Sequence, residues 1–103
     1  MSEYRTVARL EDVPEGALKQ VSLDDTTIVL ANYGGRIFAL RDRCSHEEFP
    51  LSSGEIMDGQ VTCVLHGARF DLATGAPRAL PAVRPVRTYE TRVDGENIQI
   101  LVD

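Results

Sequence analysis

The feature that most constrains this chain is a repeated cysteine–histidine pair in the middle of the sequence. Cys44 and His46 have one residue between them; sixteen intervening residues follow, and then Cys63 and His66 have two residues between them. These positions hold both cysteines and both histidines of the chain. Because a thiol and an imidazole repeated as a matched pair have few structural uses, the pattern predicts that two loops converge on one metal centre.

The ligand types narrow the choice of metal. Two thiolates and two imidazoles suit zinc or an iron–sulfur centre, whereas hard cations such as Ca²⁺ prefer oxygen ligands. Zinc fingers usually pair like ligands, with cysteines on one element and histidines on the next. Here each loop offers one of each, which matches a [2Fe–2S] centre in which two histidines replace two cysteines on one iron. A structural zinc module acting as an interaction domain stays open as an alternative.

Composition limits the class of protein that carries this centre. With 103 residues, the chain is predicted to be a single domain (1–103) that buries a core without disulfides. Its 11 basic and 16 acidic residues give a net charge of −5, which argues against nucleic-acid binding and favours a basic partner. No apolar stretch could span a bilayer, and residues 1–10 are too polar for a signal peptide, so we expect a cytoplasmic protein without a membrane anchor.

Short alternating segments bounded by turn residues predict an all-β fold. Residues 28–31 are apolar throughout, which is typical of a strand covered on both faces. No segment has helical periodicity, so we expect an antiparallel β sandwich or barrel. The predicted strands are residues 4–9, 17–23, 26–32, 36–41, 55–57, 60–65, 69–72, 88–93 and 97–102.

Two segments depart from this alternation. Residues 42–53 have no pattern, and a dozen such residues inside a compact domain are usually functional. Residues 76–85 hold three of the five prolines, which predicts an irregular, rigid segment. We expect about residues 43–82 to form a small inserted lobe that binds the metal, and the remainder to form the larger β framework.

The motif, with its surroundings, resembles Rieske-type ferredoxins. The family fingerprint is Cys-x-His, about sixteen residues, then Cys-x-x-His-Gly, and residues 44–46 and 63–67 match it. The similarity continues through residues 50–54 and 67–75, and the predicted strand order fits over the whole chain. The resemblance implies a Rieske-like fold with a covering loop that contains a proline, for which Pro81 stands at the corresponding place.

The resemblance also implies a cofactor and its ligands. One [2Fe–2S] cluster would be bound by Cys44 and Cys63 on the inner iron and by His46 and His66 on the outer iron, near the surface. Because these side chains would fill both irons and no other cluster of titratable groups stands out, we expect an electron carrier and not an enzyme.

Four departures from respiratory Rieske proteins bear on the reduction potential. Those proteins have an extra cysteine in each ligand loop, where this chain has Phe49 and Leu65, and hydroxyl donors to the sulfurs where it has Ala68 and Phe70. Each missing donor removes stabilisation of the more negative reduced state. We therefore predict a potential at the low end of the Rieske range.

The resemblance finally implies partners. Small free-standing chains of this pattern are ferredoxin components of aromatic ring-hydroxylating dioxygenases, which carry single electrons from an NAD(P)H-dependent flavin reductase to a terminal oxygenase. A monomer that docks transiently on each partner is expected. The alternative within the family is the small subunit of an NAD(P)H-dependent nitrite reductase.

Overall fold

The structure, a computed structural model, describes residues 3–42, 50–63, 67–79 and 85–102. Every strand pairing in this part of the chain is antiparallel, which confirms the predicted all-β class. The elements are, in order, β1 (Glu3–Arg9), η1 (Leu10–Asp12), β2 (Leu18–Leu23), β3 (Thr26–Tyr33), β4 (Arg36–Arg41), η2 (Leu51–Ser53), β5 (Glu55–Met57), β6 (Gln60–Thr62), β7 (Arg69–Asp71), β8 (Pro77–Ala79), β9 (Thr88–Tyr89), β10 (Thr91–Asp94) and β11 (Asn97–Val102), where η marks a single-turn 3-10 helix.

A central sheet with the strand order β2-β3-β4-β9 organises the molecule. Its middle strand β3 is buried on both faces, as predicted for residues 28–31, because successive side chains of a strand point to opposite sides. Ile28 and Leu30 belong to one buried cluster, and Val29 and Ala31 belong to another. The central sheet therefore separates two hydrophobic cores.

The first core lies between the central sheet and the sheet β1-β11-β10. In β11 the fully buried Ile98 and Ile100 alternate with more exposed neighbours, so one face of this sheet packs inward. The buried members of this core are Val13, Val21, Ile28, Leu30, Ala39, Ile98 and Ile100.

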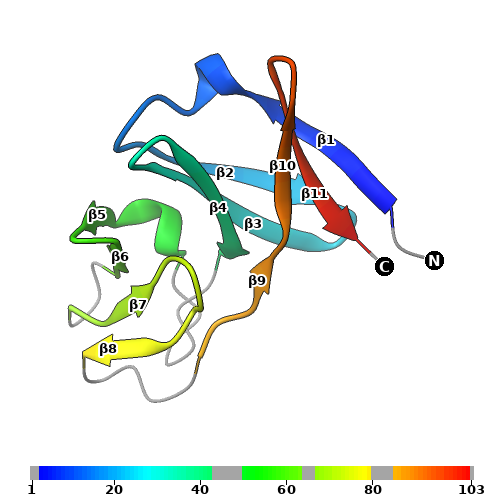
Figure 1. The fold of residues 1–103 in the computed structure, drawn as a ribbon. Helices are drawn as coiled ribbons and strands as arrows, with labels where there is room; N and C mark the ends of the chain where they lie inside the picture. The colour runs from blue at the N-terminus through cyan, green and yellow to red at the C-terminus, as the bar shows by residue number, and fades with distance from the viewer. Residues whose placement is uncertain (1–2, 43–49, 64–66, 80–84, 103) are drawn as a thin grey trace.

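The second core lies between the central sheet and the sheet β5-β6-β7-β8, which we call the inserted sheet. Figure 1 shows the inserted sheet at the lower left and β1, β10 and β11 at the upper right, with the central sheet between them. The buried members of the second core are Val29, Ala31, Leu40, Leu51, Val61, Cys63, Ala68, Phe70, Leu72 and Val86.

The inserted sheet contains the main departures from the predicted strands. Residues 77–79 form β8, although the prolines predicted an irregular segment, and its Pro77 lies opposite Phe70 on β7. Proline is tolerated there because β8 is an edge strand, where a missing N–H need not break a ladder. β7 ends at Asp71, one residue earlier than predicted, because the Asp71 carboxylate accepts bonds from the Ala73 and Thr74 amides and turns the chain.

Two further differences concern the loops. Within the unpatterned residues 42–53, the structure places the short helix η2, whose Leu51 is fully buried in the second core. The predicted strand 60–65 is a strand only as far as Thr62, and residues 64–66 lie outside the described part. No helix in the described ranges is long and apolar enough to cross a bilayer.

Candidate metal centre

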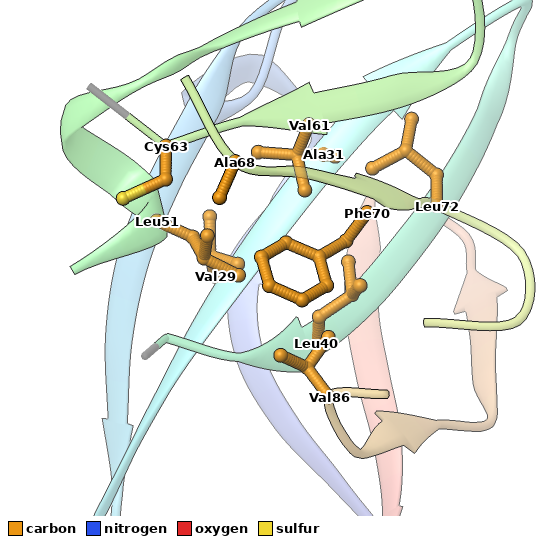
Figure 2. Close-up of a cluster of buried hydrophobic side chains, with 10 residues drawn as sticks. All are labelled: Val29, Ala31, Leu40, Leu51, Val61, Cys63, Ala68, Phe70, Leu72 and Val86. Carbon is orange, nitrogen blue, oxygen red and sulfur yellow. The ribbon is translucent and has the colours of Figure 1, made fainter. Parts of the chain in front are cut away.

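Cys63 is the predicted ligand that the structure describes, and it lies directly after β6. Its backbone N–H donates to the carbonyl of Ala68 at 2.7 Å, which extends the β6–β7 ladder by one step beyond the pair Thr62 and Arg69. The side chain is fully buried. In Figure 2 the Cys63 sulfur lies at the edge of the second core, beside Leu51 and Ala68, while Phe70 occupies the middle. The fold thus places one thiol at the boundary of an apolar core.

The other three predicted ligands, Cys44, His46 and His66, lie outside the described residues. The structure does describe the chain on both sides of them. The hydrogen bond from Cys63 to Ala68 brings together the two ends of the segment that contains His66. The ends of the segment that contains Cys44 and His46 are brought together by Asp42 and Ser52.

Asp42 is buried, with an exposed fraction of 4%, and its carboxylate accepts three hydrogen bonds. The Ser52 backbone N–H donates to Oδ1 at 2.7 Å, and the Ser52 hydroxyl donates to Oδ2 at 2.7 Å. Gln20 Nε2 on β2 also donates to Oδ2, at 2.6 Å. Burial of a carboxylate is costly unless donors replace its water, so this arrangement is specific.

A recess of about 400 Å³ opens beside Cys63, and it is lined by Ser53, Gly54, Glu55, Thr62, Cys63 and Gly67. Gly54 allows η2 to approach β6 closely. A Cβ on Gly54 would lie 1.6 Å from the Thr62 carbonyl oxygen, so any side chain there would force the two segments apart. Cys63 is therefore both buried and one of the residues that line the recess.

Backbone hydrogen bonds also fix the chain where it returns, after β8, to the neighbourhood of Gly75. The Val86 N–H donates to the Gly75 carbonyl at 2.9 Å, and the Gly75 N–H donates to the Asp71 carbonyl at 2.8 Å. Gly75 has φ +75°, and a Cβ on it would lie 2.1 Å from the Val86 carbonyl oxygen. Pro81, the proline assigned to the covering loop, lies between these anchored points in sequence and outside the described residues.

The turn after β7 is stabilised electrostatically. Burial alone raises the pKa of Asp71, but the Ala73 N–H, the Arg78 side chain and the Thr74 N–H outweigh it, so the pKa of this carboxyl is lowered overall. The ionised form is thus preferred in the folded protein, where it holds the turn that leads to Gly75.

The two described positions that bear on the reduction potential are both fully buried. Ala68 and Phe70 line the second core with hydrocarbon only, and neither provides a hydroxyl. Phe49 and Leu65 lie outside the described residues.

The surroundings of Cys63 are compatible with a metal-bound thiolate. Cys63 is buried at the margin of an apolar core, next to an open recess, and at the end of a strand that a neighbouring carbonyl holds in place. Hydrophobic surroundings of this kind control solvent access and thereby the potential of a bound cluster.

Comparison with known families identifies the class of protein. The model of the family "Rieske [2Fe-2S] domain" matches residues 3–90, so the chain belongs to this family. It is an electron-transfer protein with one Rieske-type [2Fe–2S] cluster, as the sequence motif predicts.

Similar proteins place it among ferredoxins. The chain is 36% identical over 89 residues to the ferredoxin component of biphenyl 2,3-dioxygenase from Rhodococcus jostii, covering 86% of this chain and 83% of that one. It is 44% identical over 92 residues to the 3-phenylpropionate/cinnamic acid dioxygenase ferredoxin subunit of Escherichia coli K12, covering 86% and 84%. The ferredoxin of carbazole 1,9a-dioxygenase from Nocardioides aromaticivorans has the same fold, with a TM-score of 0.90, 35% identity and coverage of 94% and 95%.

Sequence reasoning missed Asp42, Ser52 and Gln20. Two signals were present: Asp42 lies two residues before Cys44, and Ser52 lies in the stretch 50–54 that resembles the family. The sequence does not reveal that Gln20 pairs with Asp42, since the two residues are 22 positions apart, Gln20 on β2 and Asp42 just after β4, and no pattern links them.

Proposed function

We propose that this protein carries single electrons from an NAD(P)H-dependent flavin reductase to a terminal Rieske non-haem iron oxygenase. The observation that carries the proposal is similarity along nearly the whole length of free-standing ferredoxin components, including coverage of 94% of this chain and 95% of the carbazole dioxygenase ferredoxin. An electron carrier of this kind needs a partner on each side of the electron transfer.

For the ligands, we propose Cys44 and Cys63 on the inner iron and His46 and His66 on the outer iron. When bound, a Rieske cluster accepts and releases one electron at a time. Two thiolates and two neutral imidazoles contribute a ligand charge of −2, whereas four thiolates would contribute −4. The histidines therefore ease reduction relative to a four-cysteine site.

For the potential, we propose a value at the low end of the range of roughly −150 to +300 mV known for Rieske centres. Support comes from Ala68 and Phe70, which are buried and offer no hydroxyl to the sulfurs. A low potential suits a carrier that accepts electrons from a reduced flavin.

For the molecule as a whole, we propose a cytoplasmic monomer that docks transiently on each partner. We further propose that about residues 43–82 form the cluster-binding lobe and that the remainder of 1–103 forms a framework. The net charge of −5 favours a basic docking face on both partners and predicts weaker association at high salt.

The proposal is tested with the purified holoprotein and purified components of a ring-hydroxylating dioxygenase. We expect two iron and two acid-labile sulfide per chain and a Rieske-type EPR signal on reduction. In stopped-flow mixing, NADH and reductase should bleach the visible absorption, and oxidised oxygenase should restore it. Reduction without reoxidation by any oxygenase, together with stable association with a sirohaem reductase, would contradict the proposed partners.

The ligand assignment has its own test. His46→Cys should retain some cluster and lower its midpoint potential, because a thiolate adds negative charge to the ligand set. An unchanged potential in this variant would show that His46 is not a ligand.

A further inference from the structure

The Asp42 carboxylate joins three separate parts of the fold. Asp42 follows the last residue of β4, Gln20 lies on β2, and Ser52 lies in η2. The three hydrogen bonds to the carboxylate measure 2.6 to 2.7 Å. The Asp42 N–H also donates to the Thr27 carbonyl on β3 at 2.9 Å, so the backbone of this residue is held by the central sheet as well. The side chain therefore has one fixed position.

Asp42 is also the sole charged or polar residue that is buried in the part of the chain that the structure describes. A buried carboxylate that loses a donor is left with an unsatisfied oxygen, whose desolvation is then not compensated. The three contacts are therefore mutually dependent.

These contacts lie on both sides, in sequence, of two proposed cluster ligands. Asp42 comes two residues before Cys44, and Ser52 comes six residues after His46. The two bonds between Asp42 and Ser52 thus fix the distance between the two ends of the segment 43–51. The bond to Gln20 fixes those ends relative to β2, and the central sheet in turn packs against the core that contains Cys63.

We propose that Asp42 is a positioning residue for the cluster. Its carboxylate, held by Ser52 and Gln20, sets where the segment with Cys44 and His46 leaves and rejoins the fold, and hence where both ligands stand relative to Cys63. This inference rests on the ligand assignment of the proposed function, and it concerns how the ligands are held and not which they are.

The first test compares substitutions that remove the contacts with one that keeps them. Asp42→Ala loses all three, and Ser52→Ala loses the hydroxyl bond alone. Asp42→Asn keeps the planar shape: its oxygen can accept from the Ser52 amide, its NH₂ can donate to the Ser52 hydroxyl, and the Gln20 amide can turn its oxygen toward it. The measurements are the rate of cluster bleaching by an iron chelator and the g-values and line widths of the reduced cluster by EPR.

We expect Asp42→Ala to bleach about tenfold or more faster than wild type and Ser52→Ala about threefold or more, as the loss of buried hydrogen bonds implies. Both should broaden or shift the EPR signal. Asp42→Asn should restore the bleaching rate to within about twofold of wild type. In the double variant Asp42→Ala/Ser52→Ala, the rate should equal that of Asp42→Ala alone, because Asp42→Ala already removes the hydroxyl bond that Ser52→Ala removes.

Matched controls separate this role from general stability. Ser22→Ala on β2 and Asp94→Asn on β10 remove a hydroxyl and a charge from exposed positions, and neither should change the bleaching rate or the EPR signal. Urea unfolding of all variants measures the effect of each substitution on the free energy of unfolding.

Three outcomes would overturn the proposal. These are wild-type bleaching and EPR signals in both Asp42→Ala and Ser52→Ala, bleaching rates that follow global stability while the EPR signal stays unchanged, or additive effects in the double variant. Each leaves the cluster of the wild-type protein in place, so the proposed function would stand. Absence of a Rieske signal in the wild type itself would instead contradict the proposed function.

Discussion

The framework strands and the inserted sheet are held together by different means. Strands β1 to β4 and β11 are six to eight residues long and pair along most of their length, whereas β5, β6, β7 and β8 have three residues each. Three-residue strands form few ladder bonds. The Asp71 carboxylate and two glycines that allow close backbone approach support the inserted sheet, and the Asp42 carboxylate holds the preceding helix η2. The lesson is that the inserted sheet and its connections depend on single contacts, and the framework on many.

Removing the cluster should have the largest effect on the difference between the two regions. In Cys63→Ala, and in wild type stripped by chelation, we expect amides of β6 and β7 to exchange hydrogen about a hundredfold faster, because metal binding contributes to folding of the segment that holds it. Amides of β3 and β4 should keep their protection. Hydrogen exchange followed by mass spectrometry resolves the two regions. Equal protection of β6 and β7 with and without the cluster would show that the inserted sheet is self-sufficient.

Two glycine-to-alanine substitutions test whether stability depends on the close backbone approach at Gly75. Gly75→Ala places a methyl group 2.1 Å from the Val86 carbonyl, and Gly95→Ala in the β10–β11 turn meets nothing within 4 Å, although both glycines have positive φ. We expect losses in free energy of unfolding of about 3 kcal/mol and about 1 kcal/mol respectively, since the second change costs only backbone strain. Urea denaturation measures both. Similar losses would mean that the Gly75 contact relaxes freely.

Two alanine-to-serine substitutions test whether the position of an added hydroxyl decides its effect on the midpoint potential of the cluster. Ala68→Ser should raise the midpoint potential by about 40 mV, which corresponds to about 1 kcal/mol of preferential hydrogen bonding to the reduced centre. Ala39→Ser, equally buried but in the framework core, should lower stability without moving the potential. Spectroelectrochemical titration of the two variants decides the matter. A shift in Ala39→Ser of the same size would refute a local effect.

The smallest expected effect is the pH dependence of the Asp71 turn. Because the pKa of Asp71 is lowered on folding, its contribution to stability is present above the ordinary aspartate pKa of about 4 and is lost as the pH falls through the folded-state value. We expect Asp71→Ala to cost about 1 kcal/mol at pH 7 and less at pH 3. Denaturation of both proteins across this range provides the measurement, and a constant difference would argue that Asp71 acts without its charge.

These contrasts also explain how much the sequence could predict. Most framework strands were predictable because apolar patterns and paired turn residues act locally, as in the fully buried run at 28–31. The predicted strand 88–93 was an exception: it divides into β9 in the central sheet and β10 in the sheet with β1 and β11. The ligand motif was predictable because its residue types and spacing are chemically specific. β8 was not, since proline at Pro77 argues against a strand unless the strand is known to lie at an edge.

The contacts that hold the site could not be predicted from local sequence patterns either. The bond between Gln20 and Asp42 joins β2 to the residue that follows β4, a strand that is not its neighbour in the sheet, and no periodicity links the two positions. The approach of Gly75 to Val86 likewise depends on how the chain returns after β8. Both are products of tertiary packing, so a single sequence contains the residues but not their partners.

The pairing of β4 with β9 has a consequence for protein engineering. Ala39 lies opposite Tyr89 and Leu40 opposite Thr88, so the chain leaves the central sheet for the inserted sheet and returns to it on adjacent strands, about 5 Å apart. Everything between these strands occupies the position of a hairpin turn. Both ends of the proposed cluster-binding lobe are therefore held at one place in the sheet. A cassette cut there would still need a replacement cover for Val29, Ala31 and Leu40, which the lobe buries.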